Sequence, residues 1–222
     1  LAVSDCDGIL VTHEHSDHIS GLQTLLKRCA APVFTTERAA RELSWRLPGA
    51  ETRLDALDFG IPQSIGEFAV TAFPTSHDAP GSCGFRLDAA GGAVGVLTDT
   101  GYVTDEAADI LEGVDLAVLE ANHDIETLRS GPYPYYLKQR ILGAQGHLSN
   151  EDAARFAAVL AQSGTSEIIL AHLSRENNTP AMAQTAVERA LSAAGVSPLL
   201  SVAPRDCLGP AHTVSRRSVC RR

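Results

Sequence analysis

The stretch Thr12-His13-Glu14-His15-Ser16-Asp17-His18 carries three imidazoles and two carboxylates within seven residues. Such a dense set of nitrogen and oxygen ligands favours a metal site over a packing role, because these groups are the usual ligands of zinc, manganese and iron. The apolar run before it, residues 8–11, predicts a short buried strand, and residues 19–28 predict a helix. The cluster is therefore expected at the end of a strand, where α/β proteins commonly gather ligands.

Alternating strand and helix patterns continue through the chain and predict the α/β class. Further strands are expected at residues 32–35, 68–73, 83–88, 93–98, 115–120, 168–171 and 199–202. Further helices are expected at residues 36–47, 105–111, 135–142, 150–162 and 181–194. The length of 222 residues suits one domain, which we assign to residues 1–202. Periodicity is lost over residues 203–222, which we expect to form an irregular basic tail ending in Arg216, Arg217, Arg221 and Arg222.

The composition limits the classes of partner. A net charge of −9 argues against a broad electrostatic grip on nucleic acid. It leaves room for a metal-dependent phosphodiesterase, because bound divalent ions supply positive charge at the phosphate. The five cysteines are scattered and form no C-x-x-C pair. We see no secretory signal, and no apolar run approaches the roughly 20 residues of a membrane span. We therefore expect a cytoplasmic protein that does not bind membranes.

Three further candidate ligands come at the ends of predicted strands, and packing alone does not explain that repeated placement. They are His77, Asp99 and His172. The complete set suits two divalent ions, Zn²⁺ or Mn²⁺, because only a carboxylate can bridge and Asp99 is the available one. Two-metal hydrolytic sites place their ions about 3.5–4 Å apart, and a water between them is deprotonated near neutral pH. We expect one ion on His13, His15 and His77, the other on Asp17, His18 and His172, and Asp99 between them.

The pattern His-x-His-x-Asp-His after a strand, followed by a separated His, Asp and His, resembles the metallo-β-lactamase-fold hydrolases. Residues 74–85, 98–103, 119–124, 146–150 and 172–180 look like the YycJ/WalJ branch, whose bacterial cytosolic members are regarded as 5′-to-3′ DNA exonucleases. The resemblance implies a four-layer αββα sandwich with a dinuclear site at one edge. Such members normally carry two or more strands before the motif, whereas residues 1–7 alone precede it here. We therefore expect an N-terminally truncated sandwich, less stable than a longer relative.

His147 favours phosphodiester cleavage, because it is not needed as a ligand. Ser149, with Asp152 three residues later, has the pattern of a helix N-cap. His147 is therefore expected just before a helix N-terminus, a natural place for a phosphate. By resemblance to related nucleases, His147 is a general acid or phosphate contact for the leaving oxygen, and Glu120 orients it. The alternatives are a loop histidine bonded to backbone and a carboxylate facing water.

We therefore expect Asp17, Glu120 and His147 to be catalytic, and His147, Ser149 and Asn150 to contact a nucleic acid, with DNA favoured. Another hydrolase of the fold, such as a thioesterase or lactonase, has the same ligands and remains an alternative. An inactive metal-binding fragment is a third possibility.

Four other features bear on these alternatives. True β-lactamases commonly carry cysteine where Asp99 stands, which argues against antibiotic hydrolysis. No β-CASP insertion fits between His147 and His172. His123 is expected near the site without an assigned role. Lys138 and Arg140 belong either to a phosphate contact or to a solvated helix face.

Overall fold

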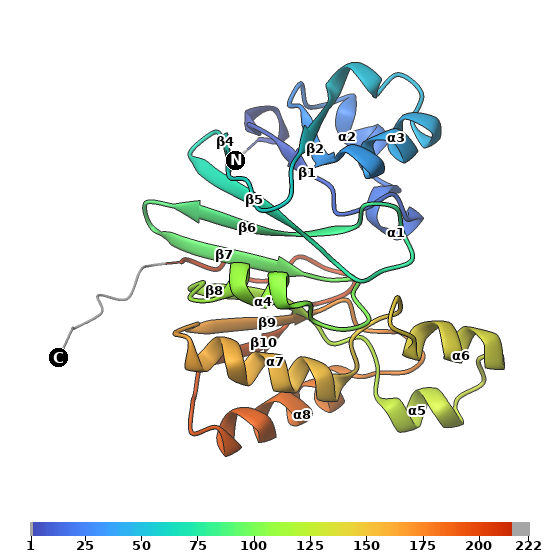
Figure 1. The fold of residues 1–222 in the computed structure, drawn as a ribbon, viewed down its shortest axis with the longest axis vertical. Coiled ribbons are helices and arrows are strands. Elements are labelled where there is room, and N and C mark those ends of the chain that lie inside the picture. The colour runs from blue at the N-terminus through green and yellow to red at the C-terminus, as the bar shows by residue number, and fades with distance from the viewer. Residues whose placement is uncertain (1, 215–222) are drawn as a thin grey trace.

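The structure, a computed structural model, describes residues 2–214 and contains two β-sheets (Figure 1). A parallel three-stranded sheet has the order β1 (Ile9–Leu10), β2 (Val33–Thr36), β3 (Leu54–Leu57). A seven-stranded sheet has the order β10-β9-β8-β7-β6-β5-β4. Its strands β4 to β7 pair antiparallel, and β7 to β10 pair parallel. Their bounds are β4 Gln63–Ile65, β5 Phe68–Pro74, β6 Cys83–Ala89, β7 Gly92–Leu97, β8 Leu116–Glu120, β9 Glu167–Ala171 and β10 Leu199–Val202.

Helices lie on the outer faces of both sheets. The smaller sheet carries α1 (Ser16–Ile19), α2 (Leu22–Leu26) and α3 (Glu37–Arg46). The larger sheet carries α4 (Asp105–Leu111), α7 (Asn150–Gln162) and α8 (Pro180–Ala193). Two further helices, α5 (Ile125–Ser130) and α6 (Tyr135–Leu142), stand off one side (Figure 1). Short 3₁₀ turns occupy Val3–Asp5 and Glu51–Arg53.

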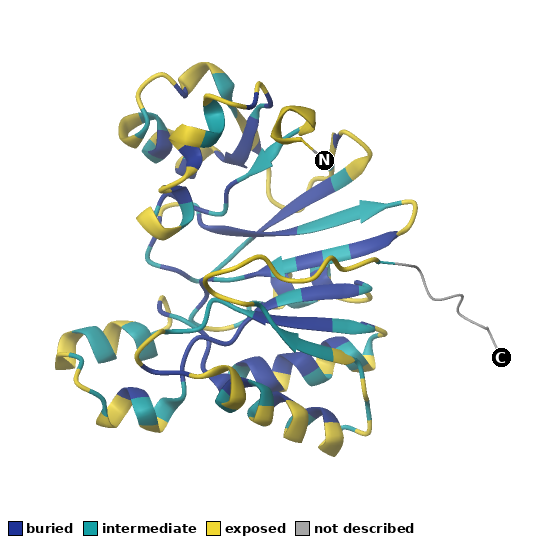
Figure 2. Ribbon diagram, turned by 180° about the vertical axis from the view of Figure 1, so that it is seen from behind, coloured by how far each residue is buried: buried dark blue, intermediate teal, exposed yellow. Residues whose placement is uncertain are grey.

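Three hydrophobic clusters separate four layers, as Figure 2 shows in the buried strands and helix faces. Strand β5 shows how one strand serves two of them. Val70 and Ala72 belong to the cluster between the sheets, whereas Phe73 belongs to the cluster under α4, α7 and α8, because successive side chains of a strand point to opposite faces. Gly84 pairs with Phe73, and a Cβ there would lie 2.4 Å from the Phe73 ring. The expected αββα layering is therefore present.

The prediction of a single helix over residues 19–28 was wrong. Helix α1 begins at Ser16, directly after His15, and ends at Ile19, and α2 begins only at Leu22. Asp17 and His18 are therefore helical residues.

Strands β3 and β4 and helix α5 were not predicted, because they are short and weakly patterned. Within residues 2–214 no helix has both the length and the apolar character that crossing a bilayer requires. The last four arginines of the predicted tail, from Arg216 on, lie outside the described residues, and residues 203–214 contain no helix or strand.

Candidate metal centre and active site

The motif residues are held by Thr12, for which the sequence pattern predicted no role. The Thr12 hydroxyl oxygen lies 3.0 Å from Nδ1 of His13 and 3.2 Å from Nδ1 of His18. Because this oxygen has two lone pairs, it can accept from both Nδ1–H groups and leave both Nε2 atoms unprotonated. A neighbour that fixes the ring and its tautomer in this way is typical of metal-ligating histidines.

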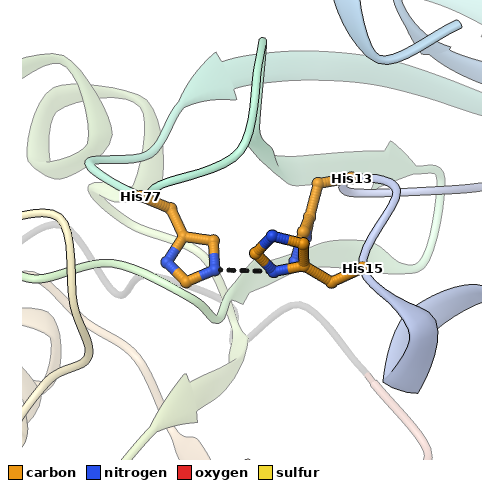
Figure 3. A group of neighbouring side chains, drawn as sticks. All are labelled: His13, His15 and His77. Carbon is orange, nitrogen blue, oxygen red and sulfur yellow. Dashed lines mark hydrogen bonds between the residues drawn. The ribbon is translucent and has the colours of Figure 1, made fainter. Parts of the chain in front are cut away.

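The first predicted triad, His13, His15 and His77, comes together with its donor atoms within 4.8 Å of one another (Figure 3). His77 follows β5, and its Nδ1 donates to the Gly146 carbonyl oxygen at 3.1 Å, so its Nε2 keeps the lone pair. That Nε2 lies 3.3 Å from Nδ1 of His15. Burial, ahead of the neighbouring His18, lowers the pKa of His13 to about 3. Burial also lowers the pKa of His77, so His13 and His77 are neutral where a cation would bind.

The second predicted triad, Asp17, His18 and His172, also has its donor atoms within 4.8 Å of one another. His172 directly follows β9, and its Nε2 lies 3.6 Å from Oδ2 of Asp17. The backbone of His172 has φ 57°, which is costly for a residue with a Cβ. Asn122 donates to the His172 carbonyl oxygen at 2.9 Å and stabilises this conformation.

Asp99 lies between the two triads, as its assigned bridging role requires. Its Oδ1 is 3.8 Å from Nε2 of His77 and 3.5 Å from Nε2 of His172, and its Oδ2 is 3.2 Å from Nε2 of His18. Burial opposes its ionisation, but the His18 and His172 imidazoles outweigh burial and hold the Asp99 pKa far below its ordinary value. Asp99 also has φ 57°, so both non-glycine residues with positive φ in the described chain belong to this centre. Strain concentrated at one site is typical of a functional site.

The donor set fits divalent cations. His13 Nε2 is buried and has no hydrogen-bond partner, although it lies among three other imidazoles, with ring centroids 4.1 to 4.9 Å away. A buried polar atom without a partner is costly, so this nitrogen lone pair calls for a ligand. Nitrogen and carboxylate donors in a protein suit zinc or manganese.

Glu120 at the end of β8 is fully buried and accepts four hydrogen bonds. Its Oε1 lies 2.8 Å from Nδ1 of both His147 and His172, and its Oε2 accepts from the backbone N–H groups of Thr100 and Leu148 at 3.1 Å. Burial opposes the charge of Glu120, but the bonds from the two histidines hold its pKa below the ordinary value. Glu120 therefore does not face water, and it orients a candidate ligand as well as His147.

The same contacts set the charge of His147 and His172. Burial disfavours both imidazolium ions, but the hydrogen bond that His147 donates to Glu120 outweighs burial and raises the pKa of His147 above its ordinary value. Bonds to Asp17 and Glu120 likewise outweigh burial and raise the pKa of His172 to about 11. With Nδ1 of His147 bonded to Glu120, Nε2 is the ring nitrogen left to a substrate.

A cleft of about 520 Å³ opens over this centre and is lined by members of both triads. Asp99 and His147 also line it, as do the cationic Arg140 and Arg175. The cleft is therefore large enough for a small portion of a polymer. Its two arginines place positive charge beside the carboxylates that also line it.

Three residues singled out from the sequence are buried outside that cleft. The Ser149 hydroxyl caps α7 by accepting from the Asp152 N–H at 3.1 Å, as the capping pattern predicted. Asn150 exchanges side-chain hydrogen bonds with Asn178. The Ser149 and Asn150 side chains therefore stabilise loops behind the site and do not line the cleft. His123 is buried, and neither of its ring nitrogens has a partner.

Comparison with known proteins gives consistent matches in sequence. The family model of the β-lactamase superfamily domain matches residues 2–173. The chain is 38% identical over 198 residues to "Exodeoxyribonuclease YycJ" of Bacillus anthracis, covering 88% of this chain and 74% of that protein. It is 39% identical over 193 residues to "Exodeoxyribonuclease WalJ" of Streptococcus pneumoniae strain D39, covering 86% of this chain and 72% of that protein.

Solved structures match in fold. The metallo-β-lactamase fold protein YhfI from Bacillus subtilis superposes with a TM-score of 0.69 at 20% identity, covering 89% of this chain and 74% of that one. The short form of human tRNase Z gives a TM-score of 0.56 at 22% identity, covering 79% of this chain and 75% of that one. These matches agree with the layers described above and concern the fold alone.

Proposed function

We propose, because this chain belongs to the β-lactamase superfamily of metallo-hydrolases, that it is a metal-dependent exonuclease that removes nucleotides from the 5′ end of DNA. The relatives named as exodeoxyribonucleases support a DNA substrate. The observation that carries the proposal is His147, clamped by Glu120 at 2.8 Å beside both ligand triads. A thioesterase has no equal need for a proton donor at this place, since a thiolate leaves without being protonated, whereas the alkoxide expelled from a phosphodiester needs a proton.

The two triads and Asp99 are the proposed ligands, with Asp99 between the ions. Two divalent ions held there would supply Lewis-acid activation of water and neutralise charge on the phosphate. Zinc and manganese both suit the donors.

The protein's own groups then divide the remaining work. Asp17 is the most exposed ligand, and the bond from His172 holds its pKa well below the ordinary value, so it stays ionised and can orient a water. His147 is the proton donor, because its raised pKa favours the imidazolium that can protonate a leaving oxygen through Nε2. Glu120 positions His147 and stabilises its charge without touching the substrate.

The test uses DNA duplexes labelled at the 5′ or the 3′ end, supplied with Mn²⁺ or Zn²⁺. We expect stepwise release from the 5′ end, no activity for Asp99→Ala, and a rate about 10²–10⁴-fold lower for His147→Ala, the range usual for losing a general acid. His212→Ala is the matched control, because His212 bonds Glu167 outside the cleft. A protein that binds metal but cleaves neither label, and instead hydrolyses a thioester or lactone, would refute the nuclease assignment.

A further inference from the structure

The pair of helices α5 and α6, residues 125–142 and here called the arm, has few buried side chains, and Leu128 is the one that α5 buries. No residue of α6 is buried, and the arm stands off the sandwich (Figure 1). Three of the chain's four tyrosines follow one another here: Tyr133, Tyr135 and Tyr136. Tyr135 and Tyr136 are 78% and 74% exposed. Large aromatic side chains gathered on an exposed surface indicate a binding surface.

The arm is cationic in an acidic protein. It carries Arg129, Lys138 and Arg140 against one carboxylate, Glu126, while the whole chain has a net charge of −9. This local excess of positive charge fits an anionic partner.

Three hollows that share lining residues lead from the metal centre to the exposed Tyr135. The cleft over the metal centre shares Asp78 and Arg140 with a neighbouring hollow. That hollow shares Gln139 and Gly143 with a third, which is lined by Tyr135 and by the arm's two other cations. The path therefore leaves the catalytic cleft, passes Arg140 and curves around α6. A path of this kind suits a flexible polymer better than a compact ligand.

The arm is nevertheless fixed to the site. Arg140 forms an ion pair with Asp78, whose Oδ1 lies 3.5 Å from Nε2 of His77 and 3.9 Å from Nε2 of His15. Lys138 donates at 2.7 Å to two carbonyl oxygens at the end of α5, which ties the two helices together. The tyrosines therefore keep a set position relative to the proposed ligands, although they do not pack on the core.

We propose that the arm binds the single-stranded segment that leads away from the scissile phosphate, an inference that rests on the proposed nuclease function. Tyr135 and Tyr136 stack on bases, and Arg129 and Arg140 contact backbone phosphates. A tyrosine can stack only on a base whose face is open, so the ligand of this surface is an unpaired strand and not a closed duplex.

The test measures strand binding without cleavage. Fluorescently labelled oligothymidylate of roughly ten nucleotides, a length within the usual site sizes, is titrated with the full chain in EDTA. Tyr135→Ala and Tyr136→Ala should each raise Kd at least about fivefold, which corresponds to about 1 kcal/mol per stacked base. Tyr135→Phe keeps the ring and should bind as the wild type does. Trp45→Ala is the control, because Trp45 is 83% exposed on α3, far along the chain from the arm.

A second readout separates this inference from the function on which it rests. Hydrolysis of bis(p-nitrophenyl) phosphate with Mn²⁺ needs no strand, so the ratio of DNA cleavage to diester cleavage should fall in both alanine variants. Alanine variants that bind the strand as the wild type does, while the wild type cleaves the diester, would overturn the role of the arm alone. Alanine variants that bind the strand normally but change the oligomeric state would also overturn the role of the arm, since the tyrosines would then form a protein interface. A wild type that cleaves no phosphodiester would overturn the nuclease function instead.

Discussion

Replacing Glu120 with glutamine tests the central support of the site. Oε1 accepts from two imidazole Nδ1–H groups and Oε2 from two backbone N–H groups, and the side chain is fully buried. Glutamine keeps one oxygen, so its NH₂ group must face two donors whichever way it turns. Two bonds are lost, and hydrogen bonds to a charged group contribute about 1.5–3 kcal/mol each. Glu120→Gln should therefore lower the free energy of unfolding by about 3–6 kcal/mol.

The assay is urea unfolding of the metal-free protein at neutral pH, analysed by linear extrapolation. Glu14→Gln is the control, because Glu14 is also buried and close to the ligands but has an oxygen, Oε2, without a hydrogen-bond partner. We expect Glu14→Gln to change stability by less than about 1 kcal/mol, since an amide can replace an unused oxygen. A Glu120→Gln protein as stable as the Glu14→Gln protein would refute the reasoning.

Three other predictions concern the ligands and a buried histidine. Thr12→Val removes the hydroxyl beside His13 and His18 and should weaken metal affinity about 10–100-fold in a chelator competition; unchanged affinity would show that Thr12 does not position these rings. Metal binding should release a proton at pH 7, because the metal-free His172 has a pKa of about 11. Calorimetry in buffers of different ionisation enthalpy measures the number of protons released. A binding enthalpy that does not depend on the buffer would contradict the protonation of His172. Burial lowers the pKa of His123 to about 4 from 6.5, so the unfolded chain binds more protons and stability falls by about 3 kcal/mol as pH drops from 6.5 to 4. His123→Leu should flatten that dependence in urea titrations, and an unchanged slope would count against it.

The sequence alone indicated which residue types form the proposed metal centre, and there is a physical reason for this. Histidines and aspartates placed at strand ends have few structural reasons to recur, so His13, His15, His77, Asp99 and His172 could be picked out. The assignment of Ser149 and Asn150 to substrate contacts went further than the pattern allowed. A capping pattern locates a helix start but does not say whether other loops cover it, and here Asn178 does.

Other parts of the site carry no local signal. Thr12 is an ordinary polar residue at a strand end, and its position against two imidazoles depends on the turn into α1. Tyr135 and Arg140 belong to a short helix whose sequence does not show which of its faces is buried. Periodicity therefore cannot predict that no residue of this helix is buried.

Side-chain type and periods of a few residues are enough to predict a class of chemistry, the alternation of helices and strands, and the order of the proposed ligands along the chain. The tertiary structure decided which side chains meet. Residues 13 and 172 share one centre only because two sheets pack face to face and bring the ends of β1 and β9 to a common edge. The double use of Glu120 and the path from the cleft to the tyrosines arise in the same way, since both depend on contacts between segments that are distant in sequence.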